Sequence, residues 1–199
     1  MSNPTLNSFL DTFAAPNLVF DRIREKSISP WLPFLTVIIV STSSHTKTRQ
    51  ELAMSNLLIA RAAKENGATR VVLVEPDLFY SAQDRGAHPD LGETHFERDI
   101  QDIKKFDGQA FTAKLYAELL KLAGVDTVLT IHNHSYSVQR IFSDIFEGDF
   151  HNLIPYQIYA HYLLNSDILN YGPEGEGLVL CAPDKGARDF VKEMYNTLG

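Results

Sequence analysis

Short apolar runs alternate with amphipathic stretches along most of this 199-residue chain. Residues 35–40 are apolar and rich in β-branched side chains, which is typical of a strand buried on both faces of a sheet. Residues 49–65 have helical spacing, and Gly67 follows them as a helix stop. The same reasoning predicts strands over 69–74, 125–131 and 178–181, and helices over 112–122 and 186–195. These repeated strand–helix units predict an α/β fold, with a mostly parallel sheet and helices on both faces.

The two ends of the chain predict further parts beside this α/β domain. Residues 5–26 are amphipathic with an interruption at Pro16, which predicts two short helices. We therefore expect an amino-terminal helical segment (1–34), an α/β domain (35–150) and the start of a second α/β domain (151–199). The last part is expected to be incomplete, because its final helix would normally lead to another strand.

Composition and charge limit the class of protein. With 44% hydrophobic and 22% charged residues, the chain has the composition of an ordinary folded domain, and its apolar runs are too short to cross a membrane. The amino terminus lacks the basic start of a secretory signal, so we expect a cytoplasmic location. A net charge of −7 argues against nucleic acid as a partner, because such binding depends on clustered Lys and Arg. The single cysteine, Cys181, excludes an internal disulfide and is predicted to be buried in a strand.

Polar residues follow the predicted strands, at the sheet edge where ligands bind in open α/β folds. Hydroxyl groups of residues 41–45 could contact phosphate, although a solvated turn explains them more simply. The loop 75–85 ends with an amide, a carboxylate and a guanidinium, which could bind phosphate beside an aromatic pair: Gln83, Asp84 and Arg85. Asp184 follows the last predicted strand, where a helix N-cap is the alternative interpretation.

The histidines His132 and His134 end the apolar run 125–131. If the strand continues through them, both side chains point to the same side, because side chains alternate along a strand. Imidazole binds divalent metals and titrates near neutral pH, so the pair could hold a cation or exchange protons. Histidines that only cap a loop are an equally good interpretation of the pair by itself.

Taken in chain order, these segments resemble the ribose-phosphate pyrophosphokinases, also called phosphoribosyl pyrophosphate synthetases. Residues 80–85 are similar to the family's Tyr-Ala-Arg-Gln-Asp-Arg motif, and residues 111–115 to its Ile-Thr-Ala-Lys-Leu helix. Residues 132–134 are similar to its Asp-Leu-His strand end, and residues 182–187 to its Ser-Pro-Asp-x-Gly-Gly loop. Gln139 and Phe142 also fit its Gln-Gly-Phe-Phe segment. The resemblance runs from about residue 35 to the end, and it implies a phosphoribosyltransferase-like (type I) architecture.

The resemblance implies transfer of the β,γ-pyrophosphoryl group of ATP to the 1-hydroxyl of ribose 5-phosphate, which makes phosphoribosyl pyrophosphate for nucleotide biosynthesis. Mg²⁺ is the implied cofactor. Carried over residue by residue, Gln83, Asp84 and Arg85 would lie at the ATP site. His134 would be the catalytic contact to the metal–triphosphate, and Asp184 would bind Mg²⁺ near the ribose hydroxyls. Such a transfer needs alignment and charge neutralisation, and a hard cation prefers the carboxylate of Asp184 to an imidazole. Family members form hexamers built from dimers, so the resemblance also implies a homo-oligomer.

This chain also differs from the family pattern. Ala82 replaces an arginine, which removes a bidentate phosphate contact, and His132 replaces an aspartate. Residues 86–110 are longer than the corresponding family segment; we interpret them as a solvated insertion with a surface helix over 99–105, and a metal-binding lid is the alternative. The family's Phe-Ser-Asp-Gly-Glu motif is missing before residue 35, as is its Thr-Gly-Gly-Thr loop for ribose 5-phosphate.

Three classes of function remain open from the sequence. The first is a ribose-phosphate pyrophosphokinase, most simply the front part of a longer enzyme. The second is a short homologue of the same fold that has lost catalysis and serves as a regulatory or interaction subunit. The third is a metal-dependent hydrolase that uses His132 and His134. A stripe of tyrosines with helical spacing (Tyr156, Tyr159 and Tyr162) is predicted to pack in a core or, as the alternative, at a subunit interface.

Overall fold

The computed structural model describes residues 35–165 and 179–198. The predicted helices within 5–26, and Leu178 of the last predicted strand, lie outside these residues. The chain separates into two compact units, Met1–Leu153 and Ile154–Gly199. Each unit is described by itself.

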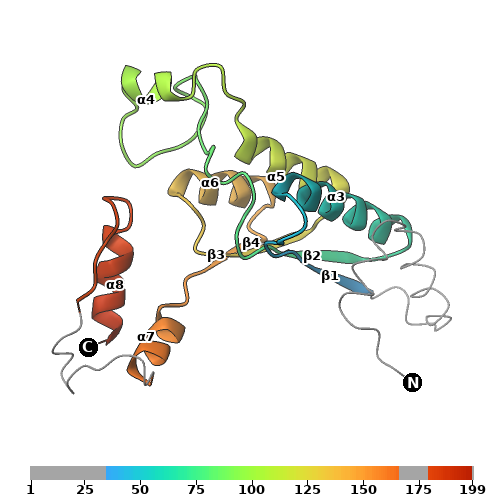
Figure 1. The fold of residues 1–199 in the computed structure, drawn as a ribbon. Helices are drawn as coiled ribbons and strands as arrows, with labels where there is room; N and C mark the ends of the chain where they lie inside the picture. Colours follow the sequence, from blue (N-terminus) through green and yellow to red (C-terminus); the bar gives the residue numbers. More distant parts are fainter. Residues whose placement is uncertain (1–34, 166–178, 199) are drawn as a thin grey trace. The chain divides into compact units, whose positions relative to one another are not determined.

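The first unit contains a four-stranded parallel sheet (Figure 1). Its strands are β1 (Thr36–Val40), β2 (Arg70–Val74), β3 (Thr127–Ile131) and β4 (Phe150–Leu153), and they lie side by side in chain order. Each strand pairs in parallel with the next, so all four carboxyl ends lie at one edge of the sheet. This arrangement confirms the predicted α/β fold with a parallel sheet flanked by helices.

Helices α3 (Arg49–Glu65), α5 (Thr112–Ala123) and α6 (Tyr136–Ile145) lie on the same face of this sheet (Figure 1). Right-handed crossovers between strands that follow one another in space place the connecting helices on one side. The side chains that fill the space between sheet and helices are apolar and fully buried, among them Val71, Leu73, Leu120, Val128 and Phe142. On the opposite face of β1, the side chains of Ile38 and Val40 are 63% and 66% exposed, so the predicted burial of this strand on both faces is wrong.

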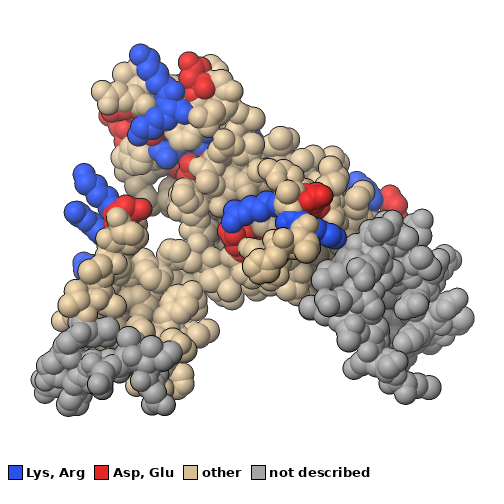
Figure 2. All heavy atoms as spheres, in the orientation of Figure 1, with Lys and Arg blue, Asp and Glu red and all other residues tan. Residues whose placement is uncertain are grey.

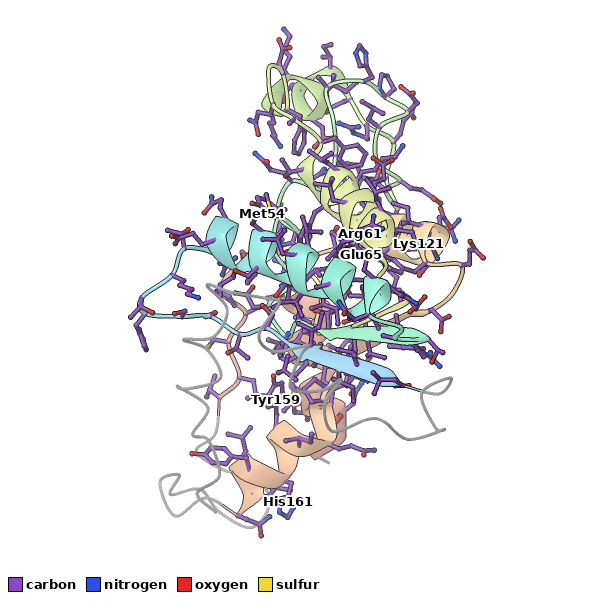
Figure 3. The ribbon with its side chains drawn as sticks, turned by 90° about the vertical axis from the view of Figure 1, so that its right-hand side faces the viewer. Met54, Arg61, Glu65, Lys121, Tyr159 and His161 are labelled. Atoms are coloured by element: carbon purple, nitrogen blue, oxygen red, sulfur yellow. The ribbon has the colours of Figure 1, made fainter. Side chains whose placement is uncertain are left out.

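Local sequence explains where these helices begin and end. Thr48 caps α3 through a reciprocal capping box, in which its side chain accepts from the backbone N–H of Glu51 and the Glu51 carboxylate accepts from the N–H of Thr48. The outer side of α3 is solvated and carries Met54 and the ion pair between Arg61 and Glu65 (Figure 3). Helix α5 ends at Gly124, whose φ of 101° disfavours any residue with a side chain.

The structure differs from the sequence-based expectation in the last part of the first unit. Helix α6 and strand β4 were not predicted. The strand Phe-His-Asn-Leu gives little signal in the sequence, because it is short and half polar. Phe150 is the one residue of β4 whose side chain is buried in the core. The centre of its ring lies 5.0 Å from the centre of the Phe142 ring. Such a strand is recognised by its pairing with β3 rather than by its composition.

The strand predicted over 178–181 is wrong for the residues that the structure describes. Val179, Leu180 and Cys181 are irregular, and Val179 is 78% exposed. Cys181 is exposed as well, so its predicted burial is also wrong. A run of four apolar residues indicates a strand only when neighbouring strands are available to pair with it.

The second unit pairs α7 (Tyr156–Leu164) with α8 (Arg188–Leu198). Two tyrosines of the predicted stripe pack against this partner helix, since the rings of Tyr156 and Tyr159 lie 5.1 and 6.2 Å from that of Phe190. Tyr162 is 61% exposed. The first two tyrosines of the stripe therefore contribute to the packing of α7 against α8.

None of the helices in the described ranges is long and apolar enough to span a membrane. On the face shown in Figure 2, basic and acidic side chains lie next to one another. Ion pairs of the first unit include Arg140 with Glu93 and Lys64 with Asp126.

Candidate functional site at the carboxyl edge of the sheet

Three loops meet where the parallel strands end: residues 41–48, 75–85 and 132–135. Backbone hydrogen bonds join their starting points, because the N–H of Ser41 donates to Val74 O over 2.8 Å and the N–H of Glu75 donates to Leu129 O over 2.9 Å. The third loop is tied to β4 in the same way, by the N–H of His132 and Leu153 O at 2.8 Å. The strand register thus brings together polar segments that are far apart in the sequence.

Gln83 connects the second loop to the start of α5. Its side-chain oxygen accepts from the hydroxyl of Thr112 at 2.7 Å, and its amide nitrogen donates to Gln109 Oε1 at 3.1 Å. The N–H of Ala113 donates to the backbone oxygen of Gln83. The segments 80–85 and 111–115, which carry the resemblance described above, are therefore in direct contact.

Asp84 connects the second loop to the third. This residue is only 2% exposed, and its carboxylate accepts a hydrogen bond from the Ser135 hydroxyl. The Ser137 hydroxyl donates to the backbone oxygen of Asp84 at 2.6 Å. Because Ser135 follows His134 directly, these bonds fix the backbone just beyond the histidine pair. The two serines are site residues that sequence reasoning missed, although their place after the histidines is a signal for an N-cap.

Arg85 is held by groups of the protein itself. Its guanidinium donates to Asp84 at 3.1 Å and to Asp102 at 2.7 Å, and it lies 4.9 Å from the ring centre of Phe106. The side chain is 21% exposed. A guanidinium shared between two carboxylates is already neutralised, so Arg85 in this conformation does not replace the family arginine that is missing at position 82.

The two histidines differ from the simple strand expectation. Strand β3 ends at Ile131, and His132 has a φ of 52°, so the alternation that would place both side chains on one side does not continue. Both imidazoles are exposed. The loop is fixed between them, because the N–H of Asn133 donates to Asn152 Oδ1 at 2.9 Å and the two amide side chains bond to each other. A left-handed backbone at a non-glycine residue is common where a site requires it.

Asp184 lies in the second unit. Its carboxylate oxygen Oδ1 accepts from the N–H of Ala187 at 3.0 Å, just before α8 begins, and its side chain is exposed. This contact closes a turn before α8 and is not an N-cap, because α8 begins at Arg188 and its N-cap position is therefore Ala187; the residue is exposed to solvent. Its assignment as a magnesium ligand, like those of Gln83, Asp84, Arg85 and His134, stays a prediction.

Residues 86–110 are mostly exposed, as a solvated insertion would be, and they are folded by contacts among themselves. Arg98, whose side chain is 4% exposed, donates to three backbone oxygens of this segment and to Asp102: Gly86 at 2.7 Å, Leu91 at 2.8 Å, His88 at 3.0 Å and the Asp102 carboxylate at 2.8 Å. The predicted surface helix is confirmed as α4 (Ile100–Lys105). The segment also reaches α6, since the ring of His95 lies 3.7 Å from that of Tyr136. In the part of the chain that the structure describes, no three His, Cys, Asp or Glu side chains gather as a metal site, so neither a metal-binding lid nor a hydrolase centre gains support.

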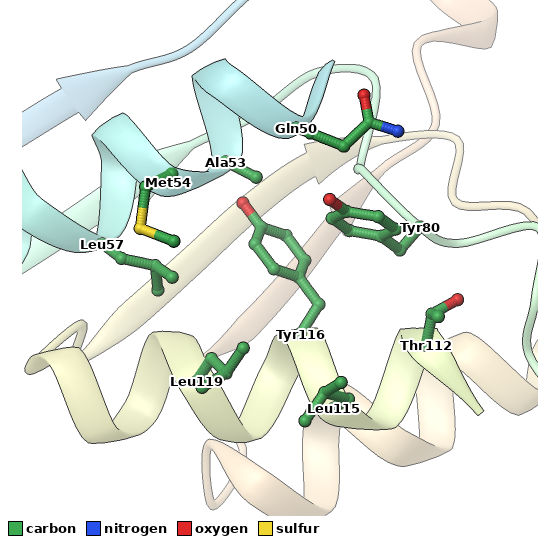
Figure 4. A pocket seen from close by; sticks show the side chains of 9 residues that line it. All are labelled: Gln50, Ala53, Met54, Leu57, Tyr80, Thr112, Leu115, Tyr116 and Leu119. Atoms are coloured by element: carbon green, nitrogen blue, oxygen red, sulfur yellow. The ribbon is translucent and has the colours of Figure 1, made fainter. Parts of the chain in front are cut away.

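Glu75 was not predicted as a site residue, and it is the most unusual group at this edge. It is fully buried, and burial raises the pKa of its carboxyl group to about 7. Its partner Tyr116 contributes, with Tyr80, to a cavity of about 270 Å³ between α3 and α5 (Figure 4). A charged residue directly after an apolar strand is the sequence signal for such a group.

Ser41 adds a second buried polar group at the same edge. It is 5% exposed, and among the described residues its hydroxyl has no hydrogen-bond partner. The four residues after it are exposed, as a solvated turn would be. The exposed residues match the solvated turn, and contact of the loop's hydroxyl groups with phosphate stays a prediction.

Comparison with known proteins gives consistent results. No family model matches the chain. It is 30% identical over 162 residues to the ribose-phosphate pyrophosphokinase of Chlorobaculum tepidum, a match that covers 81% of this chain and 40% of that protein. It is 29% identical over 161 residues to the enzyme of the same name from Pyrococcus furiosus, covering 80% of this chain and 46% of that protein. The chain thus spans less than half of the length of these relatives.

A solved structure is similar to this fold. The crystal structure of phosphoribosylpyrophosphate synthetase from Mycobacterium smegmatis superposes with a TM-score of 0.61 at 19% sequence identity, over 84% of this chain and 46% of that chain. This likeness shows a shared arrangement of strands and helices. The functional argument depends on the sequence matches and on the contacts at the carboxyl edge.

Proposed function

We propose, from the premise that this chain is a distant homologue of the ribose-phosphate pyrophosphokinases, that it binds ATP with Mg²⁺ at the carboxyl edge of its sheet. The proposal depends on contacts between the segments whose sequences are similar to the motifs of this family. Gln83 bonds to Thr112, and Asp84 bonds to Ser135 beside His134. Residues far apart in the sequence are brought together by these bonds, as a shared ligand site requires. The reaction to which this site belongs is transfer of the β,γ-pyrophosphoryl group of ATP to ribose 5-phosphate.

The groups at this edge suit binding and orientation of a triphosphate. His134 is exposed, so it can donate a hydrogen bond or, when protonated, offer positive charge to phosphate oxygens. Gln83 can offer its amide to the nucleotide, and the bond from Thr112 fixes its orientation. Bound Mg²⁺ would neutralise charge on the transferred group, and it needs few protein ligands because phosphate oxygens and water complete its shell. Asp184, in the second unit, carries the type of oxygen ligand that this cation prefers.

Calorimetric titration of Mg-ATP into the chain tests this proposal. We expect saturable binding that requires Mg²⁺ and weakens by about tenfold or more in His134→Ala, which corresponds to loss of about 1.4 kcal/mol. His161→Ala changes an exposed histidine on α7 and should leave the affinity unchanged. Absence of binding at millimolar nucleotide, or equal effects of the two substitutions, would contradict the proposal.

A non-catalytic subunit of the same fold is the second candidate function. It is favoured by one specific observation, the internal pairing of Arg85, which leaves the missing arginine at position 82 without a replacement. This candidate predicts association with other subunits and no measurable affinity for ATP. For the leading candidate we expect ATP binding with little transfer by this chain alone, because its 199 residues contain no Thr-Gly-Gly-Thr loop for the sugar phosphate.

A further inference from the structure

Glu75 lies where β2 passes into the loop that carries Gln83 and Asp84. Three elements donate hydrogen bonds to its carboxyl group, from Asn56 Nδ2 in α3 at 2.9 Å, from the Tyr116 hydroxyl in α5 at 3.0 Å and from the backbone N–H of Phe79 in the loop at 3.0 Å. The residue is fully buried. The carboxyl group is therefore the point at which loop, strand and both helices are joined.

The surroundings of this carboxyl group are poor at stabilising a negative charge. The three groups that donate to it are neutral, and the charged group that affects it from the loop is another carboxylate, Asp77. Arg49 at the start of α3 forms an ion pair with Asp77, and Tyr80 packs on Tyr116 with ring centres 5.3 Å apart. Burial raises the pKa of Glu75 to about 7, and Asp77 adds to this, while the hydrogen bonds from Phe79, Tyr116 and Asn56 oppose it. Burial and the nearby Glu75 also raise the pKa of Tyr116, so that phenol stays protonated.

Two features of the loop beside Glu75, a strained residue and a neighbouring cavity, favour a second arrangement of this loop. Tyr80 has a φ of 61°, a backbone conformation that costs free energy at a residue other than glycine. Its ring and that of Tyr116 border the cavity of about 270 Å³ between α3 and α5 (Figure 4). Displacement of Tyr80 would relieve this strain and would open a path for water toward the carboxyl group.

We propose that Glu75 is a positioning residue whose charge holds or releases the loop 76–85, and so controls the placement of Gln83 and Asp84. Neutral Glu75 can remain buried, and the loop stays packed between α3 and α5. Ionised Glu75 gains hydration when the loop moves away, so raising the pH favours the released arrangement, in which the carboxyl group has its ordinary acidity. The consequence for nucleotide binding rests on the proposed function; the movement of the loop does not.

Hydrogen exchange followed by mass spectrometry tests the movement on the whole chain. At pH 6 the peptides that cover 76–85 should be well protected, and at pH 8, after correction for intrinsic exchange rates, their protection should fall by about tenfold, since the balance changes up to tenfold per pH unit between the ordinary and the raised pKa and levels off above the raised one. Glu75→Gln keeps the shape of the side chain and cannot ionise, so its protection should remain at the pH 6 level. Glu118→Gln, an exposed site on α5, is the matched control and should behave as the unsubstituted chain.

Titration of Mg-ATP at the same two pH values separates this inference from the proposed function. If the loop responds to pH through Glu75 and no nucleotide binds at either pH, the inference stands and the proposed function fails. If the nucleotide binds while the unsubstituted chain and Glu75→Gln show the same pH response in exchange, the inference is overturned and the function stands. Should Glu75→Gln fail to fold, the carboxyl carbon shift of Glu75 in the unsubstituted chain decides, because titration near pH 4.5 overturns the inference.

Discussion

The charge of Glu75 should also control the stability of the folded chain. Its pKa is about 7 in the folded state and 4.5 as a reference, so the folded state binds the proton more tightly than the unfolded state. The sign follows from linkage: the stabilisation is fully present below pH 4.5 and is lost as the pH rises through 7. We expect Glu75→Gln to lack this loss, which amounts to roughly 3 kcal/mol for the unsubstituted chain.

Urea unfolding at several pH values between 4 and 9 measures this difference. The free energy of unfolding of the unsubstituted chain, minus that of Glu75→Gln, should fall between about pH 4.5 and 7 and level off above pH 8. Glu118→Gln again serves as control, because its exposed carboxyl group on α5 is not buried on folding. A difference that stays constant with pH would show that Glu75 has an ordinary acidity.

Gly124 is a second residue whose identity is set by its surroundings. Its φ is 101°, and an added Cβ would lie 2.5 Å from Cγ of Lys64, which pairs with Asp126 at 2.7 Å. We expect Gly124→Ala to lower the free energy of unfolding by about 1–3 kcal/mol through backbone strain and displacement of Lys64. Gly108→Ala is the matched comparison, because Gly108 has a φ of 70° with open space around it. If both substitutions cost the same in urea unfolding, the contact with Lys64 is unimportant.

At the scale of elements, the segment around α4 is stabilised by buried charge. Arg98 and Asp102 have side chains 4% and 9% exposed and pair at 2.8 Å, and Asp102 also pairs with Arg85. Removing one partner of a buried pair leaves an uncompensated charge, at a cost of about 3–5 kcal/mol. We expect Arg98→Leu to lower stability by about this amount and to expose residues 86–98 to limited proteolysis, because three backbone oxygens of the segment lose the hydrogen bond from Arg98, and those of His88 and Leu91 keep only one from a backbone N–H.

The exposed pair between Arg140 and Glu93 provides the contrast. It joins the same segment to α6 at 3.0 Å, but both side chains are about half exposed. Arg140→Ala should therefore cost less than about 1 kcal/mol and leave the proteolytic pattern unchanged. Equal sensitivity of the two variants to protease would mean that the segment is held by its surface contacts and not by the buried network.

At the scale of the whole molecule, the sequence predicts what depends on local pattern. Strands β1 to β3 and helices α3 and α5 could be predicted to within two residues, because apolar runs and stops such as Gly67 and Gly124 mark them. Strand β4 could not, because its membership in the sheet depends on pairing with β3 rather than on its own residues. The candidate site shows the same division: Gln83, Asp84 and His134 are recognisable from motifs, whereas the burial of Glu75 and the pairing of Arg85 depend on partners 17 to 41 residues away.

The overall charge of the molecule predicts how the proposed ATP site should respond to polyanions. With a net charge of −7 and with acids and bases interspersed on the face of Figure 2, attraction for a triphosphate must come from a few groups at the sheet edge. A tenfold excess of heparin should therefore change the affinity for Mg-ATP less than about twofold, because a polyanion competes for clustered Lys and Arg and is repelled by a net negative surface. Displacement of the nucleotide by heparin would instead show that binding occurs on a basic patch away from His134. His134→Ala should weaken the heparin-resistant binding by about tenfold, which ties the result to the carboxyl edge.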